Sequence, residues 1–264
     1  MDIKEALARK HKDEDSGRHP WEVARAEVVS RLLDTAASCT CSPGQAILDI
    51  GCGDAFIARR LAGIYPQSRL IGIDTALDPR MRREILDRAA APNLEIYQSL
   101  NQIPLDIGYV DIVLLLDILE HVADDAAFLN ELASNTVIKE KAVFLITVPA
   151  FQCLSSSHDR YLNHFRRYNH KQLLAAARKS AIKPLQYGYF FSSGLFLRFF
   201  QKIMEKFNII PPETETAVSN WNGGNLSNRL MTRILIHDFR VSQLLREIGL
   251  LLPGLSCYLI GQKQ

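Results

Sequence analysis

The sequence is poor in cysteine and has no long hydrophobic run. Its 264 residues include five cysteines. Their only close pair, Cys39 and Cys41, has a C-x-C spacing that fits neither a disulfide framework nor a C-x-x-C zinc or redox motif. No apolar run reaches the ~18 residues needed to span a bilayer, and the highly charged first 20 residues contain no apolar stretch of the signal-peptide kind. We therefore expect a reduced, cytoplasmic protein.

The sequence also has no large excess of positive or negative charge. The 31 Lys and Arg residues nearly balance the 29 Asp and Glu residues, which leaves a formal net charge of +2. Affinity for nucleic acid would need a local basic patch, so we expect no nucleic-acid partner. The 47% hydrophobic content is enough for one substantial core. This favours a single domain with embellishments over two full domains.

Short apolar runs alternate with helical segments in the first 150 residues. The segments between the runs have the composition of helices, and residues 21–37 form a leading helical pattern. Buried strands separated by helices predict an α/β fold, in which a mostly parallel sheet carries helices on both faces. The predicted strands are residues 46–51, 69–74, 94–99, 110–117 and 141–149.

The most specific motif is ILDIGCGDAF, residues 47–56. A predicted strand ends at Ile50 and passes into Gly51-Cys52-Gly53, where missing side chains let the backbone turn sharply and approach a ligand. The next predicted strand ends at Asp74, and a carboxylate there can accept both hydroxyls of a ribose. The turn and the acidic residue together predict a cofactor that contains a nucleoside.

Two residues argue against a dinucleotide as that cofactor. The third glycine of the G-x-G-x-x-G pattern is replaced by Phe56, which would obstruct close packing of the following helix. Asp49 also places negative charge where a pyrophosphate would lie, and this favours a cationic ligand.

The motif LDIGCGDA, Asp74 at the end of the next strand and LEHV after the fourth strand resemble the class I S-adenosylmethionine-dependent methyltransferases. The resemblance implies a Rossmann-like sheet of seven strands, six parallel and the last antiparallel, with S-adenosylmethionine as methyl donor and S-adenosylhomocysteine as product. It places Asp117 near the methyl-transfer region, although a helix N-cap is the alternative for this residue. Leu100 or Asn101 is expected at the adenine. The other implied cofactor contacts are Asp49, Gly51, Cys52 and Gly53 at the methionine end, and Asp74 and Thr75 at the ribose.

The resemblance also divides the chain. Residues 1–41 are expected to form an N-terminal helical cap, residues 42–187 and 251–264 the cofactor-binding core, and residues 188–250 a helical insertion or lid. In the cap, Trp21 and Arg25 would share a helical face because they are four residues apart. The resemblance implies that they cover the cofactor, with Arg25 meeting its carboxylate. The alternative is an anchoring tryptophan beside a solvated arginine.

The stretch SSSHDRYLNHFRRYNH, residues 155–170, follows the fifth predicted strand. Its histidines, His158, His164 and His170, are spaced by six residues. Six residues rotate by about 240° on a helix and span ~20 Å on a strand, so regular structure cannot gather these side chains around one ion. We therefore expect no metal site here.

A bacterial methyltransferase subgroup has a similar D-x-x-x-x-H-x-R-R-Y pattern. The resemblance implies that Tyr161, Arg166, Arg167 and Tyr168 form a wall of the acceptor pocket, with the arginines available for an anion. In the alternative, Arg167 and Tyr168 tie this loop to the core. If the acceptor is a hydroxyl, His164 is the first candidate for a base and His158 the second.

Residues 188–207 are rich in phenylalanine, more than one helical stripe requires. This segment can line a lipophilic pocket, touch a membrane surface, form a homodimer contact, or simply pack into the domain.

The sequence therefore predicts transfer of a methyl group to a small-molecule or lipid- or sugar-linked acceptor by direct in-line displacement. One alternative is a methyltransferase for a macromolecule, protein or RNA. Two others come from different classes. A nicotinamide-dependent oxidoreductase is disfavoured by Phe56 and Asp49, and a non-catalytic module that binds S-adenosylmethionine stays open.

Overall fold

The computed structural model describes residues 18–37, 44–104, 108–207 and 224–264. Two features discussed above lie outside these residues: the charged segment 1–17, and the pair Cys39 and Cys41. Three cysteines lie inside them, and all three are free thiols.

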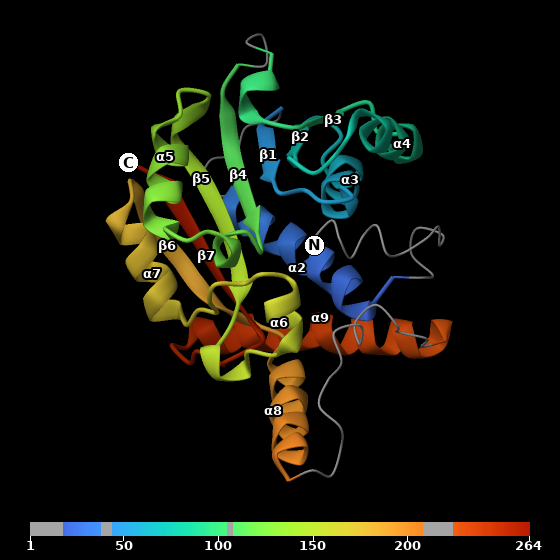
Figure 1. Cartoon of the computed structure of the whole chain (residues 1–264), viewed down its shortest axis with the longest axis vertical. Helices are drawn as coiled ribbons and strands as arrows, with labels where there is room; N and C mark the ends of the chain where they lie inside the picture. Colours follow the sequence, from blue (N-terminus) through green and yellow to red (C-terminus); the bar gives the residue numbers. More distant parts are fainter. Residues whose placement is uncertain (1–17, 38–43, 105–107, 208–223) are drawn as a thin grey trace.

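Seven strands form one sheet in the described part of the chain, in the order β3-β2-β1-β4-β5-β7-β6 (Figure 1). Strand β7 runs antiparallel to both of its neighbours, β5 and β6, whereas the remaining pairs are parallel. The predicted architecture, with six parallel strands and an antiparallel last one, is confirmed. The strands are β1 (Ala46–Ile50), β2 (Arg69–Ile73), β3 (Leu94–Tyr97), β4 (Val110–Leu116), β5 (Ile138–Pro149), β6 (Ile182–Phe190) and β7 (Ser256–Lys263).

The centre of the sheet lies at β1, which pairs with β2 on one side and β4 on the other. Strand β4 is apolar almost throughout, and Leu114 and Leu115 are fully buried, as expected for a strand covered on both faces. Ile50 is level with Ile73 on β2 and with Leu115 on β4, so the three strands end side by side. The strand order reverses direction here. In open α/β sheets this is the position where ligands bind.

Two hydrophobic cores cover the two faces of the sheet. One contains Val28, Leu61 and Leu235, from helices that pack on the same face. The other contains Leu129 and Leu173, from helices on the opposite face. The first face carries α2 (Pro20–Ala37), α3 (Phe56–Ile64), α4 (Pro79–Ala89) and α9 (Asn225–Glu247), and the second carries α5 (Asp125–Ser134) and α7 (His170–Lys179).

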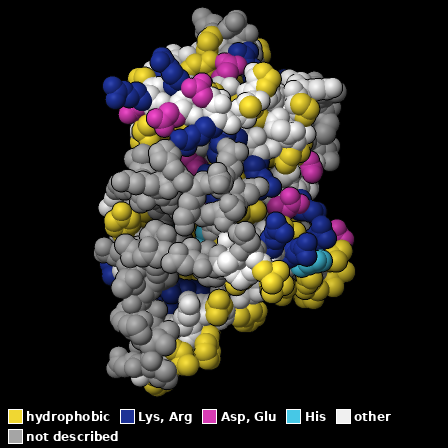
Figure 2. Space-filling model, turned by 90° about the vertical axis from the view of Figure 1, so that its right-hand side faces the viewer, with side chains coloured by type: hydrophobic (Ala, Val, Ile, Leu, Met, Phe, Trp, Pro, Cys, Tyr) yellow, Lys and Arg dark blue, Asp and Glu magenta, His cyan; other side chains and the backbone are white. Residues whose placement is uncertain are grey.

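Helices α8 (Ser192–Lys206) and α9 fill the expected insertion before the last strand, and α8 projects from the body (Figure 1). Strand β6 continues to Phe190, which pairs with Ser256, so the sheet extends three residues beyond the expected core boundary at 187. Hydrophobic side chains gather at the lower end of the face in Figure 2, the end at which Figure 1 shows α8. The exposed ones on this helix include Phe196, Leu197, Phe199 and Phe200.

The remaining short elements lie around the carboxyl ends of the strands. They are η1 (Leu100–Gln102), η3 (Leu119–His121), η4 (Gln152–Leu154) and α6 (Ser157–Tyr161). Within the described ranges, every helix is too short or too polar to cross a bilayer.

Candidate active site

The glycine turn after β1 has the sharp backbone that the sequence predicted. Gly51 and Gly53 have φ values of 74° and 57°, in the left-handed region that favours glycine. A Cβ atom on Gly51 would lie 2.1 Å from Cδ1 of Ile118, so a side chain there would force Ile118 to move in addition to straining the backbone. The amides of Gly51 and Cys52 donate hydrogen bonds to the carbonyl of Ile73, at 2.7 and 3.0 Å. The turn is thereby attached to the end of β2.

Asp74 completes this attachment with its side chain. Its Oδ2 accepts a hydrogen bond from the amide of Gly53 at 2.9 Å, and its Oδ1 accepts one from the amide of Ala76 at 2.9 Å. The acidic strand end and the glycine turn therefore meet, as the sequence predicted. Thr75 beside it is exposed, and Leu100, at the start of η1, is half-buried. The contacts of these three residues with ribose and adenine stay predictions.

The thiol of Cys52 faces away from the turn. A Cβ atom built on Gly72 would lie 2.9 Å from its Sγ, so the sulfur packs against β2. Burial, followed by the neighbouring carboxylates of Asp49 and Asp74, raises the pKa of this thiol well above its ordinary value. Cys52 can therefore serve a cofactor through its backbone, whereas its neutral side chain fills the space under the turn.

Asp49 lies beneath the glycine turn without a full set of partners. The residue is 2% exposed, and its Oδ1 has no hydrogen-bond partner among the described residues. Burial raises its pKa to about 7, Arg25 opposes this shift and Asp74 adds to it. A buried carboxylate needs a compensating positive or hydrogen-donating group. The predicted contact of Asp49 with the methionine end of the cofactor stays a prediction.

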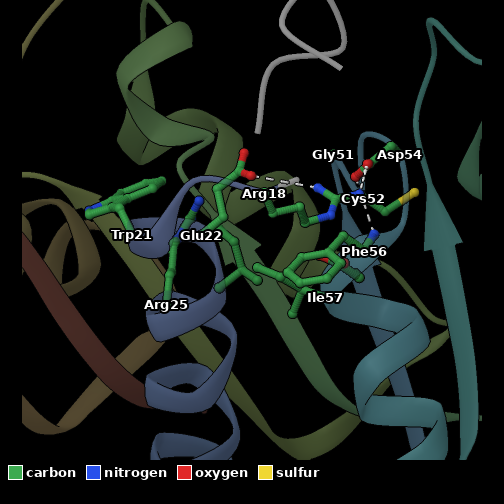
Figure 3. Close-up of a pocket in the computed structure, with 11 residues that line it drawn as sticks. Arg18, Trp21, Glu22, Arg25, Gly51, Cys52, Asp54, Phe56 and Ile57 are labelled. Atoms are coloured by element: carbon green, nitrogen blue, oxygen red, sulfur yellow. Dashed lines mark hydrogen bonds and ion pairs between the residues drawn. The ribbon is translucent and has the colours of Figure 1, made fainter. Parts of the chain in front are cut away.

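A cleft lies between α2 and the glycine turn, and side chains from both segments line it. Figure 3 shows Arg18 extending from the start of α2 toward Asp54, with which it forms an ion pair. The Arg18 guanidinium also lies 3.9 Å above the ring of Phe56. The lining residues are Arg18, Trp21, Glu22, Arg25, Asp49, Gly51, Cys52, Asp54, Phe56, Ile57 and Leu116.

Neither Arg18 nor Asp54 was predicted from the sequence. Arg18 lies two residues before α2, and its Nη1 lies 3.7 Å from Oε2 of Glu22 on that helix. The contact with Asp54 spans 36 residues of sequence, so only folding brings these two side chains together.

Arg25 is buried rather than solvated. Its Nη2 lies 2.9 Å from Oδ2 of Asp117 and donates a hydrogen bond to Oγ1 of Thr147 at 3.2 Å. The guanidinium therefore ties α2 to the ends of β4 and β5. Its Cζ lies 5.2 Å from the centre of the Trp21 ring, so the two predicted cap residues do share one side of the helix.

Asp117 does not serve as a helix N-cap. The next helical turn, η3, is capped by Ile118. Asp117 itself has a φ of 59°, a strained value for a residue with a side chain. Its side chain faces Arg25 and Thr147 at the edge of the cleft. Its predicted place near the methyl-transfer region stays a prediction.

The loop after β5 is organised by one buried carboxylate, that of Asp159. Its Oδ2 accepts from the amide of Ser156 at 2.7 Å and its Oδ1 lies 2.9 Å from Nδ1 of His164. Arg167 donates to both oxygens, at 2.8 and 3.0 Å. Burial alone would raise the pKa of Asp159, but the hydrogen bonds from His164 and Arg167 lower it well below its usual range. Asp159 is therefore ionised at neutral pH.

Two of the four residues assigned to the acceptor wall serve the scaffold instead. Arg167 also donates to the carbonyl of Ala150 at 3.3 Å, so its guanidinium is held by the loop itself. Tyr168 is 2% exposed, and its hydroxyl donates to Oδ2 of Asp125 at 2.9 Å. Arg167 and Tyr168 therefore tie the loop to the core, which was the alternative to a place in the acceptor wall. Their polar groups are already bonded, so they have little surface left for an acceptor.

The other two residues of that wall lie closer to solvent. Arg166 donates to the carbonyl of Ala123 and lies 3.4 Å from Oδ2 of Asp125, while its side chain keeps partial exposure. Tyr161 is 44% exposed and stacks with His158, with 6.5 Å between the ring centres. Their contacts with an acceptor stay predictions.

His164 meets two residues that come from a different part of the sequence. Its ring lies 4.6 Å from that of His121, centre to centre and edge to face. Ligand-type atoms of Glu120, His121 and His164 all lie within 4.8 Å of one another. Among the described residues, these three side chains form the group that is close enough together to hold a metal ion. The group includes neither His158 nor His170.

The chain is similar to known methyltransferases. Residues 48–146 match the family model described as a methyltransferase domain. A Mycolicibacterium smegmatis protein named "Probable S-adenosylmethionine-dependent methyltransferase" is 32% identical over 152 residues, which cover 56% of this chain and 54% of that protein. A ubiquinone biosynthesis O-methyltransferase from Xanthomonas campestris is 24% identical over 192 residues, covering 69% of this chain and 78% of that protein. This chain spans about half the length of its mycobacterial relatives.

Solved structures share the fold. Coclaurine N-methyltransferase bound to N-methylheliamine and SAH has a TM-score of 0.53 at 13% identity, over 89% of this chain and 72% of that one. At this identity the likeness concerns the fold alone. Residues 48–146 therefore match a methyltransferase domain in sequence, and the chain shares its fold with solved methyltransferases.

Proposed function

We propose that this chain transfers a methyl group from S-adenosylmethionine to a small-molecule or lipid- or sugar-linked acceptor. The observation that carries the proposal is the cleft beside the buried, incompletely partnered carboxylate of Asp49. Negative charge, a glycine turn and an acidic strand end suit a cofactor with an ammonium group, a sulfonium and a ribose. The choice of a small acceptor is supported by the Xanthomonas relatives, which are named O-methyltransferases.

In this proposal the residues of the chain mainly bind and orient. Asp49 compensates the ammonium group, the Gly51–Gly53 backbone approaches the methionine moiety, and Asp74 accepts the ribose hydroxyls. The bound cofactor supplies an activated methyl group, so the protein has to align a nucleophile in line with it and exclude water. Arg18, Trp21 and Phe56 would help to exclude water, since all three line the cleft and Arg18 packs over the Phe56 ring.

An acceptor hydroxyl would also have to lose a proton. His164 is the first candidate for this step, because ionised Asp159 holds Nδ1 and leaves Nε2 as the nitrogen that can take a proton. Asp159 thereby acts as a positioning residue. His158 is the second candidate, and its ring stacks on Tyr161 nearer the surface.

Isothermal titration with S-adenosylhomocysteine and with NADH tests the cofactor. We expect S-adenosylhomocysteine to bind and NADH not to bind. Asp74→Asn should weaken S-adenosylhomocysteine binding at least tenfold, because the ribose contact and the support of the turn both depend on that carboxylate. Asp78→Asn is the matched control, since Asp78 lies four residues farther on and caps α4. Binding of NADH alone, or equal affinity in both variants, would contradict the proposal.

The acceptor class is tested with S-adenosylmethionine labelled in its methyl group. We expect the label to enter small or lipid-linked molecules of a cell extract and to leave its protein and RNA fractions unlabelled. Label found only in protein or RNA would favour the macromolecular alternative.

A further inference from the structure

We propose that Glu120, His121 and His164 bind a divalent transition-metal ion, with zinc the best match, on the acceptor side of the cleft. Glu120 and His121 belong to η3, which follows β4, and His164 lies in the loop that follows β5. Strands β4 and β5 are neighbours, so their carboxyl ends bring the two segments together. Two imidazoles and one carboxylate form a common ligand set for zinc.

The spacing of the three side chains is close to what an ion requires. Their ligand-type atoms lie within 4.8 Å of one another. Ligands about 2.0–2.2 Å from a tetrahedral zinc ion are about 3.4 Å apart, so small side-chain rotations would complete the site. The amide of Phe165 donates to the carbonyl of Glu120 at 2.7 Å, which fixes the loop against η3 before any ion binds.

The carboxylate of Glu120 has no hydrogen-bond partner among the described residues, and a cation would serve as one. Its side chain is fully buried, and both carboxylate oxygens have no hydrogen-bond partner among the described residues. Buried carboxylates in proteins are normally paired, hydrogen-bonded or bound to a metal. A divalent ion would give both buried oxygens a partner.

His164 is already held in the way that metal-binding histidines usually are. Such a histidine typically donates its second ring N–H to a carboxylate, which fixes the tautomer and the orientation of the ring. Oδ1 of Asp159 lies 2.9 Å from Nδ1 of His164, and Arg167 holds that carboxylate in place. Nε2 is then the nitrogen that can coordinate an ion.

Three protein ligands leave a fourth position open on a tetrahedral ion, as in catalytic zinc sites. This part of the inference rests on the proposed function: an acceptor hydroxyl would occupy the open position. The ion lowers the pKa of a bound hydroxyl, so the proton leaves to solvent before transfer. The oxygen–methyl bond then forms as the sulfur–methyl bond breaks, and its electron pair stays on sulfur. The ion would thereby replace His164 as the group that handles the proton.

Metal binding is measured on untagged, chelator-treated protein by isothermal titration with Zn²⁺ and by visible absorption with Co²⁺. We expect one equivalent of Zn²⁺ to bind and Co²⁺ to give the d–d bands of a four- or five-coordinate site. Glu120→Gln and His164→Ala should each weaken Zn²⁺ binding at least tenfold. His170→Gln is the control, because His170 lies in the same stretch but contacts Tyr189, and it should keep the affinity of the unaltered chain.

Binding of S-adenosylhomocysteine, measured on the same samples, separates this inference from the proposed function. Retained binding in Glu120→Gln shows that the variant is folded, so a lost Zn²⁺ affinity then belongs to the ion site. If a variant does not fold, titration of the unaltered chain alone decides. No stoichiometric Zn²⁺ binding by that chain, or equal Zn²⁺ binding in Glu120→Gln, would overturn the inference. In that outcome Glu120 is a neutral buried acid.

Discussion

At the scale of single residues, three buried acids near the carboxyl ends of the strands differ in their surroundings. Asp49 lacks one partner and is pushed toward its neutral form, whereas Asp159 has three hydrogen-bonding neighbours and is held ionised. The carboxylate oxygens of Glu120 have no hydrogen-bond partner among the described residues. Sequence position alone does not distinguish these carboxylates, because desolvation and hydrogen bonding come from residues far away in the chain.

Asp49→Asn tests the charge beneath the glycine turn. The pKa of Asp49 in the folded chain is about 7, above its ordinary value of 3.8. The folded state therefore holds the proton more tightly. The stability that protonated Asp49 contributes is present below pH ~4 and is lost as the pH rises through 7. Removing the charge should stabilise the unliganded protein by about 1–3 kcal/mol at pH 8 and by much less at pH 5.

Urea denaturation at the two pH values measures this effect, and titration with S-adenosylhomocysteine should show weaker binding because an amide cannot compensate the ammonium group. The exposed carboxylate of Asp87 gives a control, since Asp87→Asn should change stability by less than about 0.5 kcal/mol at either pH. An equal gain at pH 5 and pH 8 for Asp49→Asn would contradict the raised pKa.

At the scale of elements, two helix ends have alanine where the backbone conformation favours glycine. Ala55 precedes α3 with a φ of 56°. Ala90 ends α4 with a φ of 46°. Both residues pay a steric penalty because a Cβ atom crowds the left-handed conformation. Ala55 is fully buried, whereas Ala90 is exposed, so only Ala90 isolates the backbone effect.

Ala90→Gly should therefore stabilise the protein by about 0.5–1 kcal/mol. Ala89→Gly, one residue earlier and inside α4, is the control and should destabilise it by a similar amount, since glycine is unfavourable within a helix. Midpoints of urea denaturation compare the two variants with the unaltered chain. A loss of stability in both variants would show that α4 does not end in the left-handed conformation.

The elements that the sequence predicted best are the central strands. Residues 46–51, 69–74 and 110–117 correspond to β1, β2 and β4 within one residue at each end, because runs buried on both faces are apolar throughout. Strand β6 was harder to recognise, since it is followed without interruption by the phenylalanine-rich helix α8. The hydrophobic pattern there does not show where the strand ends and the helix begins.

At the scale of the whole molecule, the sheet order places the cleft and the loop after β5 on the same edge. The cap helix α2 and the inserted helix α9 pack together, and Oγ1 of Thr232 donates to the carbonyl of Pro20 at 3.4 Å. Segments from both ends of the chain therefore cover one face of the sheet. The division into cap, core and insertion, and the role of the insertion as a lid, stay predictions.

Helix α8 is the expected place of a peripheral membrane or homodimer contact. Phe196, Phe199 and Phe200 are 70%, 58% and 56% exposed. Their joint replacement by serine should lower sedimentation with anionic vesicles several-fold, because exposed aromatic side chains supply the affinity of interfacial helices. Stability should change by less than about 1 kcal/mol. In contrast, Phe190→Ser should be strongly destabilising, since Phe190 is fully buried.

Vesicle sedimentation and light scattering on the same samples distinguish the two kinds of contact. Loss of vesicle binding by a monomeric protein supports a lipid surface, whereas a dimer that becomes monomeric in the triple variant supports a second copy. Unchanged behaviour in both measurements would show that α8 carries neither contact.

The sequence by itself determined the class of fold, the glycine turn and the acidic residue that meets it. These features depend on local backbone conformation and on the burial of neighbouring strands, which leave regular patterns in the chain. Only the tertiary structure decided which side chains meet at the site. It forms the ion pairs of Arg18 with Asp54 and of Arg25 with Asp117, and it places Glu120 and His121 beside His164. Such contacts join side chains far apart in the sequence at the ends of adjacent strands, and no local periodicity encodes which of them will meet.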